Sequence, residues 1–157
     1  MFLDDSESRC HSFWEMAKTL CSEKGVTLAL DIAYSAADAN RLLADQKQYD
    51  VACFDHDLCE EHYKAQCIEN MGGEDFTYGE VPTGLTSAEA AMDLEVSKRP
   101  LVGVAHSMNT AGRLRIFEYL RDHDIDTACN FPFSIPIYKD VLRQVIDKLI
   151  LPRQAQI

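Results

Sequence analysis

Three short apolar segments of the chain each end in acidic residues or histidine. They are Phe2–Leu3 before Asp4 and Asp5, Val51–Phe54 before Asp55, His56 and Asp57, and Leu101–Ala105 before His106 and Ser107. Short apolar runs of this kind are typical of buried strands. In open sheets of parallel strands, ligands bind outside the carboxyl ends of the strands. The chain is therefore predicted to fold around a sheet that has one polar, titratable edge.

Strand-like and helix-like segments alternate along the chain. The expected strands are Met1–Leu3, Thr27–Ala33, Val51–Phe54, Leu101–Ala105 and Asp126–Phe131, and the expected helices are Ser8–Lys24, Ser35–Gln46, Thr86–Lys98, Thr110–His123 and Tyr138–Leu149. Five such units imply a parallel sheet covered by helices on both faces. We expect an α/β fold with a doubly wound, five-stranded parallel sheet of the flavodoxin type, in the strand order 2-1-3-4-5.

A single domain is expected over residues 1–150 of the 157-residue chain, followed by a tail at 151–157 that is expected to be disordered after Pro152. A long, acidic, glycine-containing insertion interrupts the pattern at about residues 58–82, where Cys59–Met71 has the composition of a helix. Connections of this length are usually functional. The insertion is interpreted as a lid or specificity loop, or else as a solvated loop.

The composition excludes some classes of partner. The net charge is −11, which argues against non-specific nucleic-acid binding, because such binding neutralises phosphates with Lys and Arg. The charge does not exclude a small phosphate compound that is bound through a divalent cation. No apolar run approaches the roughly 20 residues of a membrane span, and the first residues do not resemble a signal peptide. We therefore expect a cytoplasmic protein with reduced cysteines and no membrane partner.

The carboxylates at the predicted sheet edge have the chemistry of a metal site. The expected order makes strands 1, 3 and 4 neighbours, so Asp4, Asp5 and Asp55 should lie close together with His106. Carboxylate oxygens suit Mg²⁺ or Mn²⁺. Asp57 is either a further ligand or a solvated turn residue.

These residues resemble the acidic pocket of response-regulator receiver domains. The resemblance is carried by Asp4-Asp5 after the first strand, Asp55 after the third and Thr83-Gly84-Leu85 before the third helix. In that family the acids bind Mg²⁺ and the third-strand Asp accepts a phosphoryl group. Receivers end strand 4 with Ser or Thr and strand 5 with Lys, whereas this chain has His106 and Asn130-Phe131 there.

A narrower group, the cyclic-phosphate processing receiver-like domains, is similar to this chain in three motifs. They are Leu3-Asp4-Asp5, Phe54-Asp55-His56-Asp57-Leu58 and His106-Ser107-Met108-Asn109-Thr110-Ala111-Gly112-Arg113. The resemblance implies hydrolysis of cyclic phosphates. Opening a cyclic phosphate needs an activated water and a protonated leaving oxygen, and imidazoles can supply both. His106, His56 and Asp55 are the candidate catalytic residues, although each histidine could instead support a neighbouring carboxylate.

The start of the fourth predicted helix is a candidate phosphate site. Ser107 or Asn109 can cap this helix, and free N–H groups at a helix N-terminus bind phosphate. Gly112 would allow a phosphate to approach the backbone closely, and the guanidinium of Arg113 could donate a pair of hydrogen bonds to phosphate oxygens. The alternative is an ordinary capped helix with Arg113 facing solvent.

The favoured function is a metal-dependent phosphoesterase that uses Mg²⁺ or Mn²⁺ on a cyclic or terminal phosphate of a nucleotide or a nucleic-acid end. One alternative is a non-catalytic, degenerate receiver module that binds a protein partner or a nucleotide. Another is a phosphoacceptor receiver, which the missing strand 5 lysine disfavours. A structural zinc at His56, Cys59, His62 and Cys67 is also disfavoured, because their spacing matches no common zinc motif.

Overall fold

The computed structural model describes residues 1–45, 48–59, 82–125 and 127–154. Its five strands form one parallel sheet in the order β2-β1-β3-β4-β5. The strands are β1 Phe2–Leu3, β2 Ile32–Ala33, β3 Val51–Phe54, β4 Val102–His106 and β5 Thr127–Phe131. The fold is therefore α/β and flavodoxin-like, and the predicted fold class and strand order are confirmed.

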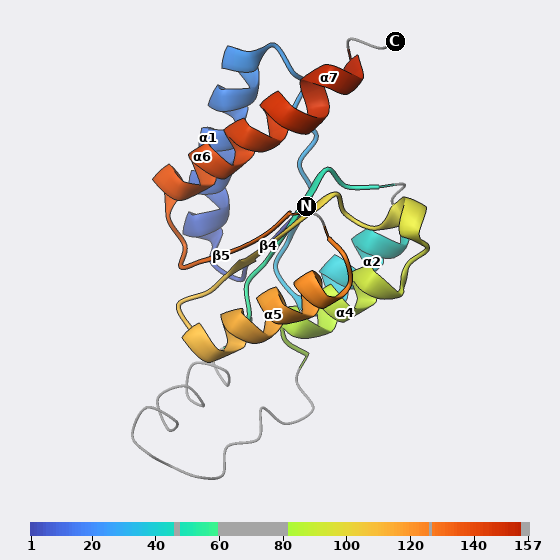
Figure 1. Cartoon of the computed structure of the whole chain (residues 1–157). Helices are drawn as coiled ribbons and strands as arrows, with labels where there is room; N and C mark the ends of the chain where they lie inside the picture. Colours follow the sequence, from blue (N-terminus) through green and yellow to red (C-terminus); the bar gives the residue numbers. More distant parts are fainter. Residues whose placement is uncertain (46–47, 60–81, 126, 155–157) are drawn as a thin grey trace, which may run out of the picture.

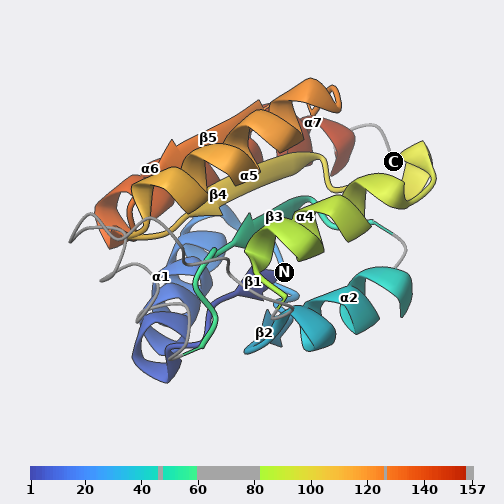
Figure 2. The same ribbon diagram turned by 90° about the horizontal axis from the view of Figure 1, so that it is seen from below.

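Helices cover both faces of the sheet (Figures 1 and 2). The helices are α1 Glu7–Lys24, α2 Ala36–Asp45, α4 Gly84–Asp93, α5 Thr110–Asp122, α6 Ile135–Val145 and α7 Leu151–Gln154. One face carries α1 and α6, and the other carries α2, α4 and α5. Because side chains alternate between the faces of a strand, Phe54 packs on the α2–α4–α5 side, whereas Cys53 packs on the α1–α6 side.

Local sequence signals explain several helix ends. Ser6 caps α1 by accepting a hydrogen bond from the Arg9 N–H, and Gly25 ends it at φ 68°, a conformation that glycine adopts without steric cost. The expected helix at Thr86–Lys98 is wrong at both ends. It begins two residues earlier, at Gly84, because Thr83 is its cap and Thr86 completes a capping box. It ends at Asp93 because Leu94 is extended, and a separate 3₁₀ turn follows at Val96–Lys98.

The last helical segment also differs from the expectation. It begins at Ile135 rather than Tyr138, because Pro136 lies in the first turn, where its missing N–H costs nothing. It continues through a π turn at Ile146–Ile150 into α7. The tail expected after Pro152 is helical as far as Gln154.

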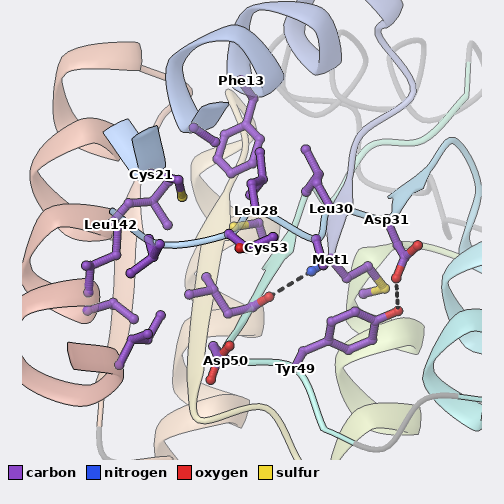
Figure 3. A pocket seen from close by; sticks show the side chains of 18 of the residues that line it. Met1, Phe13, Cys21, Leu28, Leu30, Asp31, Tyr49, Asp50, Cys53 and Leu142 are labelled. Atoms are coloured by element: carbon purple, nitrogen blue, oxygen red, sulfur yellow. Dashed lines mark hydrogen bonds between the residues drawn. The ribbon is translucent and has the colours of Figure 1, made fainter. Parts of the chain in front are cut away.

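β2 is much shorter than the predicted strand at Thr27–Ala33. Only Ile32–Ala33 pairs with β1, because β1 has just two residues. The extended segment before β2 instead borders a cavity of about 310 Å³ beneath α1 and α6. Figure 3 shows Leu28 and Leu30 on its wall, with the hydroxyl of Tyr49 bonded to Asp31. This cavity lies at the amino end of the strands, opposite the predicted site.

Other expectations concern the segment between β3 and α4. Most of the insertion at 58–82, including the helix expected at Cys59–Met71, lies outside the described residues. The zinc alternative, which needs His62 and Cys67, lies there as well. Cys10, Cys21, Cys53 and Cys129 are free thiols. Within the described ranges, no helix combines the length and hydropathy needed to span a membrane.

Candidate metal centre

Asp4, Asp55 and His106 meet at the carboxyl edge of the sheet. Asp4 and Asp55 directly follow β1 and β3, and His106 is the last residue of β4, the next strand along. The parallel register pairs Leu3 with Phe54 and Phe54 with Ala105, so the three residues lie at the same level. Their candidate ligand atoms all lie within 4.8 Å of one another, and all three side chains are buried.

Arg9 joins these acids from the first turn of α1. Its Nε lies 2.9 and 2.8 Å from the two carboxylate oxygens of Asp4, and its Nη2 lies 3.2 Å from Asp5 Oδ1 and 3.1 Å from Asp55 Oδ2. Sequence reasoning did not find this residue. Its position four residues after Asp5 was an available signal, because residues at that spacing are neighbours on a helix.

The two buried carboxyl groups have opposite pKa shifts. Burial raises the pKa of Asp4, but hydrogen bonds from His106 and Arg9 outweigh burial, so the pKa lies below its usual value. For Asp55, burial and then the charge of Asp4 raise the pKa to about 8, and a hydrogen bond with Ser107 opposes the shift only in part. In the metal-free protein at neutral pH, Asp4 is therefore ionised and Asp55 mostly holds its proton.

His106 is enclosed by aromatic rings. It stacks on Phe2 with ring centroids 4.8 Å apart and meets the edges of Phe133 and Tyr138. Burial lowers its pKa, so the imidazole is neutral. Its Nε2 lies 3.2 Å from Asp4 Oδ2, and an ionised Asp4 requires that Nε2 donates. The buried Nδ1 has no hydrogen-bond partner in the described parts of the chain.

His56 and Asp57 do not reach this centre. They point to the other face of the sheet, where His56 Nδ1 lies 2.6 Å from Asp57 Oδ1 and Asn109 Nδ2 donates to the same oxygen over 3.2 Å. Asn109 Oδ1 caps α5 by accepting from the Gly112 N–H. A Cβ on Gly112 would lie 2.3 Å from His56 Cγ. Gly112 therefore lets α5 pack against His56.

Only one of the four predicted phosphate residues lies beside the acids. Ser107 lines a recess of about 20 Å³ together with Arg9, Asp55, His106, Met108 and Phe133. Arg113 does not line the recess. Its guanidinium donates hydrogen bonds to Asn130 Oδ1 and to the carbonyl oxygen of Ser107. The recess has room for about one water-sized group. A phosphate would thus have to lie across its mouth.

Comparisons with known proteins do not identify this chain. No family model, curated protein or solved structure matches it. The interpretation of the site therefore rests on its geometry and on the three motifs described above.

The support that Asn109 gives to the fold can be measured directly. We expect Asn109→Ala to lower the free energy of unfolding by about 1–2 kcal/mol, because α5 loses its cap and Asp57 loses a buried donor. Asn109→Ser retains a capping oxygen and should lose less. Urea unfolding followed by circular dichroism tests both variants. Equal stability of Asn109→Ala and the wild type would show that this network contributes nothing.

Proposed function

We propose that this protein is a receiver-like, metal-dependent phosphoesterase that hydrolyses cyclic or terminal phosphates of nucleotides. The observation that carries the proposal is the convergence of Asp4, Asp55 and His106 within 4.8 Å beside a recess open to a small group. The three motifs that resemble cyclic-phosphate processing receivers supply the reaction class.

The residues present fit a divalent cation. Metal ligands must be deprotonated carboxylates or neutral imidazoles, and Asp4 is already ionised and His106 already neutral. The proton on His106 Nε2, which faces Asp4, would have to move to Nδ1 before Nε2 could bind a metal. Asp55 would release its proton on binding. Two oxygen ligands and one nitrogen ligand suit Mn²⁺ better than Mg²⁺, which prefers oxygen alone. A bound cation would neutralise phosphate charge and lower the pKa of a water molecule.

The protein's own groups around the recess suit a nucleotide phosphate. The Ser107 hydroxyl and the Arg9 guanidinium can donate to phosphate oxygens. Met108, which is two-thirds exposed, and Phe133 form an apolar rim on which a nucleoside could rest. His56 is the one candidate catalytic residue that contributes no group to this recess.

A non-catalytic receiver-like module is the second candidate, and several observations favour it. Arg9 already bonds to the acids, and β5 ends in Asn130 and Phe131, where receivers have a lysine. The face formed by α5, β5 and α6, which degenerate receivers use for docking, exposes Leu114 and Ile137. Such a module would bind its partner regardless of metal.

The test is hydrolysis of 2′,3′-cyclic nucleotides and of oligonucleotides that end in a cyclic phosphate, with Mn²⁺ or Mg²⁺. We expect turnover that EDTA abolishes and that the isosteric variant Asp55→Asn lacks. Surface variant Arg41→Gln, which removes only an exposed ion pair on α2, should retain full activity. Folded, metal-bound protein without turnover on any of these substrates would contradict the enzyme and favour the module.

A further inference from the structure

Arg9 occupies an unusual position for a cation. It lies in the first turn of α1, where the helix dipole disfavours positive charge. Its side chain is nonetheless three-quarters covered, and its guanidinium contacts three carboxyl groups. The acids, rather than the helix, therefore determine where this side chain lies.

Asp4 has no acceptor position left for another cation. A carboxylate offers about four lone-pair sites. Oδ1 accepts from the Ser6 N–H and from Arg9 Nε, and Oδ2 accepts from Arg9 Nε and His106 Nε2. An ion that binds Asp4 must displace at least one of these donors. Of the three donor residues, Arg9 is the one whose long side chain reaches solvent.

The same conflict exists at Asp55. Its Oδ2 lies 3.1 Å from Arg9 Nη2, and this carboxyl belongs to the group that could hold the metal. A divalent ion at the centre of that group would lie next to a fixed positive charge. Repulsion between two cations at such short range is strong in a buried site. The guanidinium and a metal therefore cannot share these oxygens.

We infer that the Arg9 guanidinium holds the cation position of the metal-free site and leaves it when a divalent ion binds. Arg9 thus lowers the metal affinity of the protein while it stabilises the metal-free fold. This inference rests on the metal site of the proposed function, but it concerns binding and does not depend on turnover.

Manganese titration of the full-length chain tests the inference. We expect Arg9→Gln to bind Mn²⁺ at least 10-fold more tightly than the wild type in isothermal calorimetry, a change worth about 1.4 kcal/mol. The metal-free variant should have a lower melting temperature than the metal-free wild type, and Mn²⁺ should raise its melting temperature by more. Arg9→Lys keeps a positive charge but lacks the forked guanidinium, so its Mn²⁺ affinity should lie between those of the wild type and Arg9→Gln. Arg41→Gln should bind Mn²⁺ as tightly as the wild type does.

A measurement on the wild type keeps the test independent of the folding of these variants. The Arg9 Nε–H proton, held by Asp4, should exchange slowly with water in nitrogen-15 NMR. Addition of Mg²⁺ or Zn²⁺, which are not paramagnetic, should shift that signal and speed its exchange. An unchanged signal in metal-saturated protein would show that Arg9 stays in place, and would overturn the inference.

The outcomes separate the inference from the proposed function. Equal or weaker Mn²⁺ binding by Arg9→Gln would overturn the inference and leave the metal site intact. Binding by neither protein would overturn both. Tighter binding by Arg9→Gln, with no hydrolysis by the metal-loaded wild type, would support the inference and contradict the enzyme.

Discussion

Replacement of Gly84 by alanine is expected to lower the free energy of unfolding by about 3 kcal/mol or more. A Cβ at this position would lie 1.8 Å from the backbone oxygen of Asp55 and 2.7 Å from its carbonyl carbon. Backbone atoms at the end of a central strand cannot rotate away as a side chain can. The first turn of α4 would have to move, and Asp55 would move with it.

Gly25→Ala is the matched control for this substitution. Gly25 has a positive φ but nothing within 4 Å of the added Cβ, so its replacement costs about 1–2 kcal/mol from backbone conformation alone. Urea unfolding of both variants measures the difference. If Gly84→Ala lowers the free energy of unfolding by no more than Gly25→Ala does, then α4 does not pack closely against the end of β3.

Asp55→Asn is expected to reduce metal-dependent hydrolysis by more than about 100-fold, because loss of a metal ligand removes several kcal/mol of charge stabilisation. The fold should survive, since the pKa of about 8 leaves Asp55 mostly uncharged at neutral pH, and asparagine has the same shape. Mn²⁺ titration and circular dichroism of the variant test the two parts separately. Mn²⁺ affinity equal to that of the wild type would remove Asp55 from the metal site.

The same substitution should change how stability depends on pH in EDTA. The pKa of Asp55 rises from 3.8 in the unfolded chain to about 8 in the folded protein, so the folded state holds an extra proton between these values. Its stabilising contribution is complete below pH 3.8 and is lost as the pH rises through about 8. The loss is at most about 1.4 kcal/mol per pH unit.

Urea unfolding at pH 5, 6, 7 and 8 measures this contribution without interference from Asp4. The lowered pKa of Asp4 contributes stability that is lost only below its ordinary value of 3.8. Burial lowers the pKa of His106 and lowers that of the Met1 amino group to about 6, so both groups add stability as the pH rises in this range, equally in the two proteins. We therefore expect the stability of the wild type relative to that of Asp55→Asn to fall as the pH rises from 5 to 8. Parallel curves for the two proteins would show that Asp55 is ionised throughout this range.

The sequence predicted the features that depend on short stretches of chain. Val51–Phe54 is β3 as expected, and Asp4, Asp55 and His106 gather because each one ends a strand of the predicted sheet. Strand order followed from the alternation of strands and helices, which allows few topologies. A polar residue at the end of a buried parallel strand has one available edge, so a local pattern was sufficient to place it.

Side-chain direction at the sheet edge was decided by the tertiary structure. Asp55 points toward α1, whereas His56, the next residue, points under α5 and bonds to Asp57. Alternation alone predicts opposite faces for neighbours, but the docked helices determine what each face contains. The docking of α5 thus places Asn109 and Gly112, two of the predicted phosphate residues, against Asp57 and His56.

Arg9 marks the limit of what the sequence determined. Its spacing from Asp5, which precedes α1, indicates only an ion pair with that residue, and an isolated surface ion pair contributes little stability. Its bonds to Asp4 and Asp55 arise because α1 docks with its first turn over the ends of β1 and β3. The sequence by itself determined the strand order and the acids at the strand ends. The docking of α1, which buries one face of that helix against the sheet and so fixes where its first turn lies, decided which positive charge those acids meet.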